Sequence, residues 1–158
     1  MIKNRKQIRL KKYDYAQSGW YFVTICTQNR ECLFGEIVDG KMKLNDVGNI
    51  IDTQWNGLLN RFHNIQLDEY VVMPNHFHGI IIIPSNNGRD NPAPTTLGRI
   101  IAYFKYESTK QINQYYVGAG ILPPHTIKKI FQRNYYEHII RNEEELHAIR
   151  RYIEKNPL

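Results

Sequence analysis

The chain has 158 residues, which is enough for one domain with a buried core and too few for two ordinary domains. It contains no apolar run near the roughly 20 residues that span a bilayer, and no apolar stretch of signal-peptide type follows its basic N-terminus. These features exclude an integral membrane protein and predict one cytoplasmic domain over residues 1–158. The chain has two cysteines, Cys26 and Cys32, and we expect them to be reduced structural thiols.

The excess of positive charge is concentrated at the N-terminus. The chain carries 21 basic and 15 acidic residues, a net charge of +6. Six of the basic residues lie among the first twelve, where there is no acid: Lys3, Arg5, Lys6, Arg9, Lys11 and Lys12. Such a cationic arm, over residues 1–14, suits a polyanion such as nucleic acid, because each phosphate contact releases counterions. A solvated tail that only aids solubility explains the charge equally well.

The first third of the chain predicts a strand, a hairpin and a helix. Residues 20–27 (WYFVTICT) form an aromatic and β-branched run that is typical of a central strand. Asp39-Gly40 lies between two short alternating segments and predicts a type I′ hairpin turn. Asn45 is placed to cap a helix over 46–61. The apolar face of this helix would consist of Val47, Ile50, Ile51, Trp55, Leu58, Leu59 and Phe62.

The middle of the chain predicts two strands, a loop and a second helix. Residues 66–73 and 76–83 read as antiparallel strands joined by a tight turn at Pro74-Asn75. Residues 84–94 (PSNNGRDNPAP) are typical of a mobile surface loop. Thr95 or Thr96 can cap a helix that runs to about residue 114. Its inward residues would be Leu97, Ile100, Ile101, Phe104 and Ile112.

The C-terminal part predicts a short strand near 130–133 and a last helix. Asn142 and Glu145 approximate a capping box at the start of that helix, and Pro157 ends it. The order β, α, β, β, α, β with a final helix predicts an α+β fold with a ferredoxin-like antiparallel sheet. We expect the strands 66–73 and 76–83 in the middle of the sheet and the helices packed mainly on one face.

Two histidines interrupt an otherwise apolar strand. In YVVMPNHFHGIIII (70–83), His76 and His78 share one face of the predicted strand and Phe77 takes the other. Two imidazoles on one face can chelate a divalent ion, although for a His-x-His taken alone two ordinary polar residues are the better explanation. Tyr152 and Asn156 are four residues apart in the last helix, so a phenol and an amide could face the histidines together. Taken alone, Tyr152 is better explained as a rim residue of the apolar stripe of that helix.

Three blocks of the sequence together resemble a known family. They are GWYFVTICTQNRECLFG, VVMPNHFHGIIII and FQRNYYEHIIRNEEELHAIRRYIEKNPL. The combination looks like the REP-associated tyrosine transposases, relatives of the single-tyrosine insertion-sequence transposases within the HUH endonuclease superfamily. The resemblance runs from about residue 19 to the end, and the segments 84–94 and 115–127 are unmatched. By this resemblance His76 and His78 are metal ligands, Tyr152 is the nucleophile and Asn156 is a third metal ligand.

The resemblance implies a transposase that cuts single-stranded DNA near hairpins through a 5′-phosphotyrosine intermediate. A site with two imidazoles and an amide has little charge of its own, so it suits a metal that also binds a phosphate oxygen. We expect Mg²⁺ or Mn²⁺ as the cofactor. Besides the arm, Arg99 and Lys105 are candidate DNA contacts. The resemblance leaves open whether the protein is a monomer or a homodimer, and it implies a bacterial, nucleoid-associated protein.

Two other functions fit the sequence. A non-catalytic, sequence-specific nucleic-acid-binding protein would need the fold and the basic arm, but it would not need the His76, His78, Tyr152 and Asn156 set. A metal hydrolase could use His76, His78 and His138 with water as its nucleophile, and it would form no covalent adduct with DNA.

Overall fold

The computed structural model describes residues 18–84 and 95–157. The predicted arm and nearly all of the predicted loop at 84–94 lie outside the described residues. The elements in chain order are β1 (Gly19–Cys26), the 3-10 turn η1 (Gln28–Arg30), β2 (Gly35–Val38), β3 (Lys41–Leu44), α1 (Asp46–Asn56), α2 (Leu58–Arg61), β4 (Gln66–Met73), β5 (His76–Ile83), α3 (Leu97–Gly118), β6 (Tyr136–Ile140) and α4 (Glu143–Glu154).

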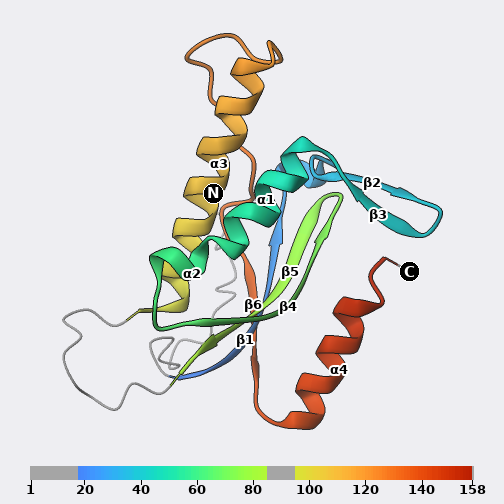
Figure 1. Cartoon of the computed structure of the whole chain (residues 1–158), viewed down its shortest axis with the longest axis vertical. Coiled ribbons are helices and arrows are strands. Elements are labelled where there is room, and N and C mark those ends of the chain that lie inside the picture. The colour runs from blue at the N-terminus through green and yellow to red at the C-terminus, as the bar shows by residue number, and fades with distance from the viewer. Residues whose placement is uncertain (1–17, 85–94, 158) are drawn as a thin grey trace, which may run out of the picture.

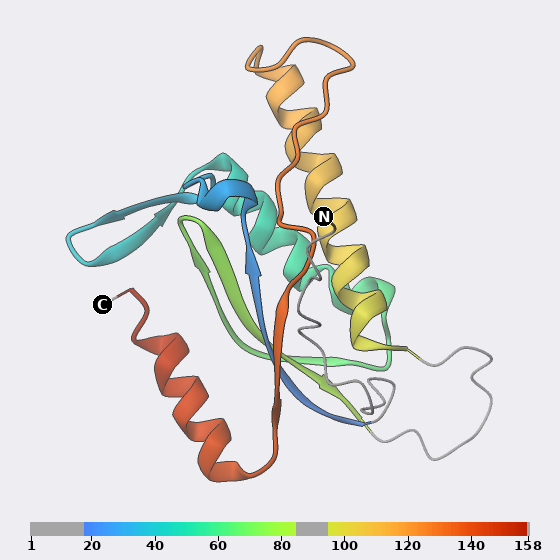
Figure 2. The same ribbon diagram turned by 180° about the vertical axis from the view of Figure 1, so that it is seen from behind.

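A four-stranded sheet in the order β4-β5-β1-β6 forms the centre of the fold, and each neighbouring pair is antiparallel. The helices α1 and α3 lie on one side of this sheet and α4 lies on the other (Figures 1 and 2). The predicted α+β class and antiparallel sheet are confirmed. The prediction that strands 66–73 and 76–83 both lie in the middle of the sheet is wrong. β4 forms an edge, and β5 pairs with β1 in the middle. The sequence of β4 suits an edge, since it carries Asp68 and Glu69.

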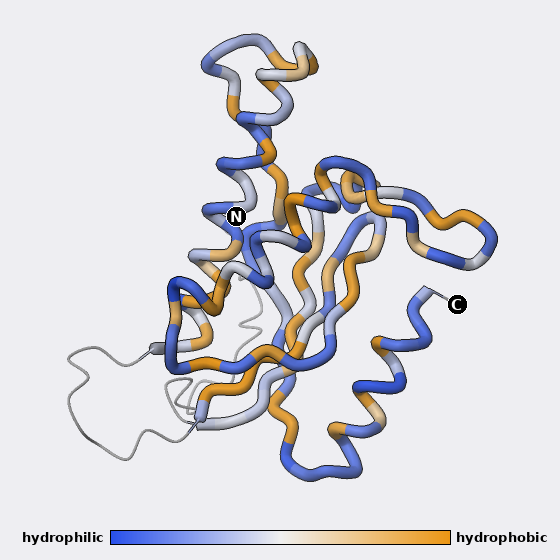
Figure 3. The backbone as a smooth tube through the Cα atoms, in the orientation of Figure 1, coloured by the Kyte–Doolittle hydropathy of each residue, from blue (hydrophilic) through white to orange (hydrophobic). Residues whose placement is uncertain are grey.

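The main core fills the space between the sheet and the α1–α3 layer. Trp55, Phe77 and Phe104 are fully buried there, with ring centroids 4.5 Å apart for Trp55–Phe77 and 5.5 Å for Phe77–Phe104. A Cβ atom at Gly79 would stand 2.6 Å from the Trp55 ring, so only glycine admits this close approach. The hydrophobic stretches gather along the strands, whereas α4 is mostly hydrophilic with isolated apolar positions (Figure 3).

The predicted turn and helix cap near the start of the chain are confirmed, and the predicted extent of the helix is not. Asp39 and Gly40 have φ values of 51° and 73°, as a type I′ turn requires. The Oδ1 atom of Asn45 accepts a hydrogen bond of 2.9 Å from the N–H of Gly48, which confirms the helix cap. The prediction of one helix over 46–61 is wrong, because the helix is interrupted at Gly57. After this break Leu59 is 45% exposed and does not join the apolar face.

The second half contains two further corrections. α3 is capped by Thr96, whose Oγ1 accepts from the N–H of Arg99 at 3.2 Å, and it continues to Gly118, beyond the predicted end. All five residues predicted to face inward are fully buried. The predicted strand at 130–133 reduces to an isolated bridge between Phe131 and Thr27, and the sixth strand is Tyr136–Ile140. The segment keeps a backbone bond from the N–H of Gln132 to the carbonyl of Cys26 at 3.0 Å, and Lys105 Nζ binds the carbonyls of residues 132 and 133.

α4 begins as predicted. Asn142 Oδ1 accepts from the N–H of Glu145 at 2.8 Å, and Glu145 Oε2 accepts from the N–H of Arg141 at 2.9 Å. Three glutamates in the first turn oppose the positive end of the helix dipole. Leu146 and Ile153 then pack onto Ile80 and Ile140 of the sheet, so this second and smaller core holds α4 on the side opposite α1 and α3.

Candidate active site

The two histidines lie on the face of β5 that α4 covers. Phe77 points to the main core, and strand alternation turns His76 and His78 to the opposite face. Their ring centroids are 4.7 Å apart. The ring of Tyr152, on α4, lies 5.4 Å from that of His78. The expectation that both imidazoles share one face within reach of the last helix is therefore confirmed.

Each imidazole is oriented through its Nδ1 atom. His76 Nδ1 lies 2.8 Å from Asn75 Oδ1, and His78 Nδ1 lies 2.8 Å from Thr24 Oγ1. An amide oxygen only accepts hydrogen bonds, so His76 must carry its proton on Nδ1 and present the Nε2 lone pair. The hydroxyl of Thr24 allows the same tautomer at His78. Outer partners of this kind are what orients metal-binding histidines.

Burial keeps both imidazoles neutral at physiological pH. His78 is only 6% exposed, and this desolvation, with a smaller effect from neighbouring His76, lowers its pKa to about 4. The pKa of His76 is also lowered, first by burial and second by the charge of Arg30. Phe22 stacks on His78 at 5.3 Å and supplies part of the apolar surroundings. Neutral imidazole is the form that binds a metal ion, so neither ring must lose a proton first.

Tyr152 combines a fixed backbone with an exposed side chain. It lies beside Ile153, one of the residues that anchor α4, yet its own side chain is 52% exposed. Its ring meets that of Phe22 edge-on at 6.3 Å. The phenol is thus positioned next to His78 and remains accessible to a large substrate.

A bidentate ion pair fastens α4 to the edge of the sheet. Arg150 Nε lies 2.8 Å from Asp68 Oδ1, and Arg150 Nη2 lies 2.7 Å from Asp68 Oδ2. The guanidinium also lies over the ring of Trp20, 5.7 Å from its centroid. The hydrogen bond from Arg150 lowers the pKa of Asp68, so the pair is ionised at neutral pH. Because Arg150 is two residues before Tyr152, this pair helps to set the position of the phenol.

Asn156 lies beyond the end of α4, which corrects the expectation of a helical amide. The helix ends at Glu154, and Asn156 Nδ2 donates to the backbone oxygen of Tyr152 at 2.9 Å. This bond leaves Oδ1 available as a ligand atom. A role of Asn156 in metal binding stays a prediction.

The other predicted site residues lie elsewhere. Arg99 and Lys105 are on α3, across the sheet from the histidines, and Lys105 Nζ bonds to the carbonyl oxygens of residues 132 and 133. His138 contacts Glu145 through Nε2 and does not join the histidine pair. In the part of the chain that the structure describes, no group of three His, Cys, Asp or Glu side chains could hold a metal ion. The six basic arm residues lie outside the described residues.

The sequence did not point to Thr24, Asn75, Arg30 or Asp68 as contributors to the site. Asn75 directly precedes His76, and that adjacency was the one available signal. Thr24 is identified only by strand register, since it pairs with His78 across β1 and β5. Arg30 donates to Cys26 Sγ at 3.1 Å and brings a cation beside His76.

No family model matches the chain. An uncharacterized protein of Haemophilus influenzae is 39% identical over 171 aligned positions, which cover 99% of this chain and 90% of the relative. The chain belongs to the same family as this Haemophilus influenzae protein.

Two solved structures share the fold of this chain. One is a REP-associated tyrosine transposase bound to a REP hairpin, with a TM-score of 0.65, 19% identity, and coverage of 94% of this chain and 72% of that chain. The other is a candidate transposase from Deinococcus radiodurans, with a TM-score of 0.54, 15% identity, and coverage of 92% and 95%. Within the described residues, no helix is both long enough and apolar enough to span a bilayer.

Proposed function

We propose that the protein is a transposase-type enzyme that cuts and rejoins single-stranded DNA through a covalent bond to Tyr152. The observation that carries the proposal is the exposed phenol of Tyr152 beside His78 and, through it, His76. The shared fold with a transposase bound to a REP hairpin supports the same substrate class. A protein that only binds DNA has no need for a neutral imidazole pair next to an exposed phenol.

The donor set fits a divalent metal that also binds phosphate. His76 and His78 would hold it through Nε2, because their Nδ1 atoms are occupied, and Asn156 would add Oδ1. All three ligands are neutral, so the ion would keep its charge for the substrate. Mn²⁺ accepts nitrogen and oxygen ligands of this kind, and Mg²⁺ is the alternative. When bound, the ion would polarise a phosphate oxygen as a Lewis acid.

The residues of the chain account for the bond changes. Tyr152 Oη attacks the phosphorus, the bond from phosphorus to the 3′ oxygen breaks, and the tyrosine becomes a 5′-phosphotyrosine. The phenol proton passes to solvent, and the departing 3′ oxygen takes up a proton to become a hydroxyl. One phosphoester replaces another, so the step is reversible and needs no nucleotide cofactor. Attack by the 3′-hydroxyl of a second strand on the phosphotyrosine completes strand transfer.

Two features of the surroundings suit this substrate. The cation of Arg30 beside His76 favours an approaching phosphate. α4 packs on the sheet of its own chain, so a single chain brings tyrosine and histidines together, and one chain is sufficient for cleavage. The substrate is single-stranded DNA next to a hairpin, because an unpaired strand allows a phosphate to reach the face of the sheet. We expect the protein to act in the cytoplasm, at the nucleoid.

The deciding experiment is incubation with a hairpin that carries single-stranded flanks, in the presence of Mn²⁺, followed by a denaturing gel. The wild type forms a protein–DNA adduct, and Tyr152→Phe lowers the adduct yield by at least about a thousandfold, because the nucleophilic hydroxyl is gone. Tyr115→Phe on α3, which removes only a hydroxyl bonded to Asp46 on the side of the sheet away from the histidines, is the matched control and keeps full activity. Cleavage by Tyr152→Phe without an adduct would indicate water as the nucleophile.

A second tyrosine tests the assignment of the nucleophile. Tyr136 on β6 is also 52% exposed, and Thr24 pairs with it on one side and with His78 on the other. Tyr136 therefore shares the face and level of the histidines. We expect Tyr136→Phe to form the adduct at nearly the wild-type rate. If Tyr136→Phe loses the adduct and Tyr152→Phe keeps it, the nucleophile is on β6 and not on α4.

A further inference from the structure

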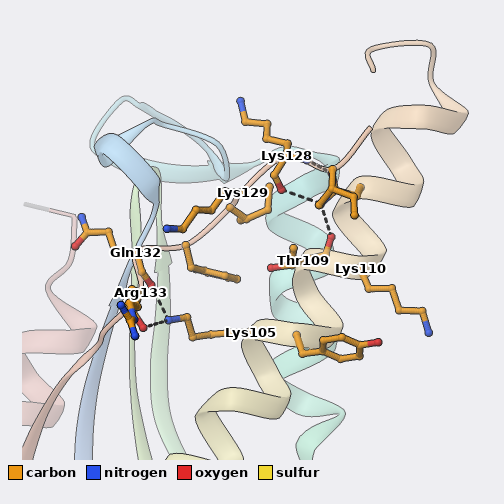
Figure 4. A pocket seen from close by; sticks show the side chains of 12 residues that line it. Lys105, Thr109, Lys110, Lys128, Lys129, Gln132 and Arg133 are labelled. Carbon is orange, nitrogen blue, oxygen red and sulfur yellow. Dashed lines mark hydrogen bonds between the residues drawn. The ribbon is translucent and has the colours of Figure 1, made fainter. Parts of the chain in front are cut away.

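A second candidate site lies between α3 and the segment 127–133, on the side of the sheet away from Tyr152. The space between these two walls has a volume of about 660 Å³. Figure 4 shows side chains from both walls around it. Neither the histidines nor any residue of α4 lines it. We call this space the α3 groove.

The two walls of the α3 groove are joined by specific hydrogen bonds. Asn113, itself 8% exposed, donates from Nδ2 to the Lys128 carbonyl at 3.0 Å and accepts from the Lys128 N–H at 2.6 Å. Lys105 Nζ donates to the carbonyls of Gln132 and Arg133 at 2.6 and 3.1 Å (Figure 4). The segment 127–133 is thus fixed to α3 at both ends. A preformed groove loses little entropy when a ligand enters.

Exposed apolar groups line the interior of the α3 groove. Tyr106 is 65% exposed and Ile127 is 82% exposed, whereas Ile130 and Phe131 form a buried floor. Large apolar side chains left this exposed at a groove are typical of a ligand site. The aromatic face of Tyr106 can stack on a planar ring.

The rim of the α3 groove is cationic. Lys110, Lys129 and Arg133 are exposed, and no ion pair involves them within the described residues. Lys128 pairs with Glu31 at 3.0 Å. Lys110 and Lys129 extend in different directions from the two walls (Figure 4). No acidic side chain is among the described residues that line the groove. An apolar interior with a cationic rim is the chemistry that an unpaired nucleic-acid strand requires.

We propose that the α3 groove binds an unpaired DNA segment, with a base against Tyr106 and the flanking phosphates on Lys110, Lys129 and Arg133. The choice of DNA as the ligand rests on the proposed function. The position supports it, because the N–H of Gln132 bonds to the carbonyl of Cys26 at 3.0 Å, and Cys26 pairs with His76. The groove wall therefore adjoins the end of the sheet where the proposed cleavage site lies. A strand held there would flank the phosphate that is cut.

The test measures binding of a fluorescent single-stranded oligonucleotide, with no hairpin, by anisotropy over a range of salt concentrations. The double variant Lys110→Gln/Lys129→Gln should weaken binding and reduce the salt slope by about 1.4, the value for two lost phosphate contacts on a single strand. The matched control is Lys41→Gln/Lys43→Gln, which removes two exposed lysines from the β2–β3 hairpin. It should leave both quantities close to those of the wild type.

The role of the base is tested with Tyr106→Ser and with an abasic oligonucleotide of the same length. Tyr106→Ser should lower affinity for the normal strand by about tenfold, since stacking on one aromatic ring is of this size. The abasic strand should bind the wild type about tenfold more weakly, and Tyr106→Ser should bind both strands alike. The competing ligand is a poly-glutamate peptide. If it displaces the oligonucleotide from the wild type but not from the lysine variant, and if Tyr106→Ser has no effect on binding, the groove is a site for acidic peptides. That result would overturn the proposal.

Failure of this inference and failure of the proposed function are distinguishable by the adduct assay. Normal adduct formation with unchanged oligonucleotide binding in all groove variants overturns the α3 groove and leaves the chemistry of Tyr152 intact. Groove-dependent binding by a wild type that forms no adduct supports the α3 groove and overturns the proposed catalysis.

Discussion

The two faces of the sheet are built in different ways. On one face α1 and α3 cover a large core of closely packed aromatic rings around Trp55, Phe77 and Phe104. On the other face α4 rests on a few apolar contacts and on the Asp68–Arg150 pair, and it leaves the candidate active site partly open. We therefore expect the face under α1 and α3 to contribute most of the free energy of unfolding. Substitutions on the face under α4 should change that free energy little. Within β5, alternate side chains belong to different faces, so single substitutions on one strand separate the two roles.

The largest effect is expected from a substitution on the core face of that strand. Phe77→Ala removes a fully buried ring from the aromatic cluster and should lower the free energy of unfolding by about 3–5 kcal/mol. His76→Ala, one residue away on the other face, should change stability far less and should abolish adduct formation. Urea unfolding of both variants without metal measures the difference. Equal destabilisation by the two substitutions would show that the faces are not separable.

The next prediction concerns the pH dependence of stability without metal. The pKa of His78 is lowered to about 4 in the folded protein, so between pH 6.5 and 4 the unfolded chain binds more protons than the folded one. Stability should therefore fall as the pH falls through this window, by about 2 kcal/mol between pH 7 and pH 5. The lowered pKa of Asp68 does not contribute there, because its stabilisation is lost only below the unfolded pKa of about 4.

Urea unfolding at pH 7 and pH 5, with a chelator present, measures this dependence. The lowered pKa of His76 acts in the same direction, so His78→Gln should reduce the difference between the two pH values and His76→Gln/His78→Gln should remove most of it. His63→Gln, at an exposed position, is the matched control and should keep the wild-type difference. A wild-type protein that is equally stable at both pH values would contradict the neutral, desolvated state of His78.

The Asp68–Arg150 pair allows the position of Tyr152 to be altered without touching it. Asp68→Asn removes the charge that holds Arg150, so α4 should dock less firmly and adduct formation should fall by about tenfold. The unfolding free energy should fall by only about 1–2 kcal/mol. Affinity for DNA should stay nearly constant. Asp39→Asn, at the tip of the β2–β3 hairpin, is the control and should leave the rate of adduct formation unchanged. The charge exchange Asp68→Arg with Arg150→Asp should restore part of the rate that Asp68→Asn loses.

The sequence predicted the histidine face correctly because its signals are local. Pro74-Asn75 marks the turn, the run of isoleucines marks β5, and alternation then places His76 and His78 on one face. The ion pair between Asp68 and Arg150 spans 82 positions and has no local signal. The same holds for Thr24, whose role depends on strand register. The arm stays a prediction, because it lies outside the described residues.

The sequence favoured 130–133 over 136–140 as the strand before α4, and this prediction is wrong. Both 130–133 and 136–140 contain β-branched or aromatic residues, and the choice between them depends on which one β1 can pair with. The first segment keeps only a bridge to Thr27. At its end, two carbonyl groups accept hydrogen bonds from Lys105. This residue was expected to contact DNA from its charge alone. Its Nζ atom is instead part of the wall of the α3 groove, and Arg99 stays a candidate contact.

The smallest effect is expected at Asn156, where two roles must be told apart. Its Nδ2 atom already bonds to the Tyr152 carbonyl at the end of α4, so a loss of activity could come from a disturbed helix end or from a lost metal ligand. If Oδ1 binds the metal, Asn156→Ala should lower the rate of adduct formation severalfold at limiting Mn²⁺. The Mn²⁺ concentration that gives half of the maximal rate should rise. Saturating Mn²⁺ should then recover most of the rate, because mass action compensates for one lost ligand that water can replace. If the side chain only secures the helix end, the rate should fall by the same factor at every Mn²⁺ concentration. Lys155→Ala, at the adjacent exposed position, controls for a general disturbance of this terminus and should leave the titration unchanged.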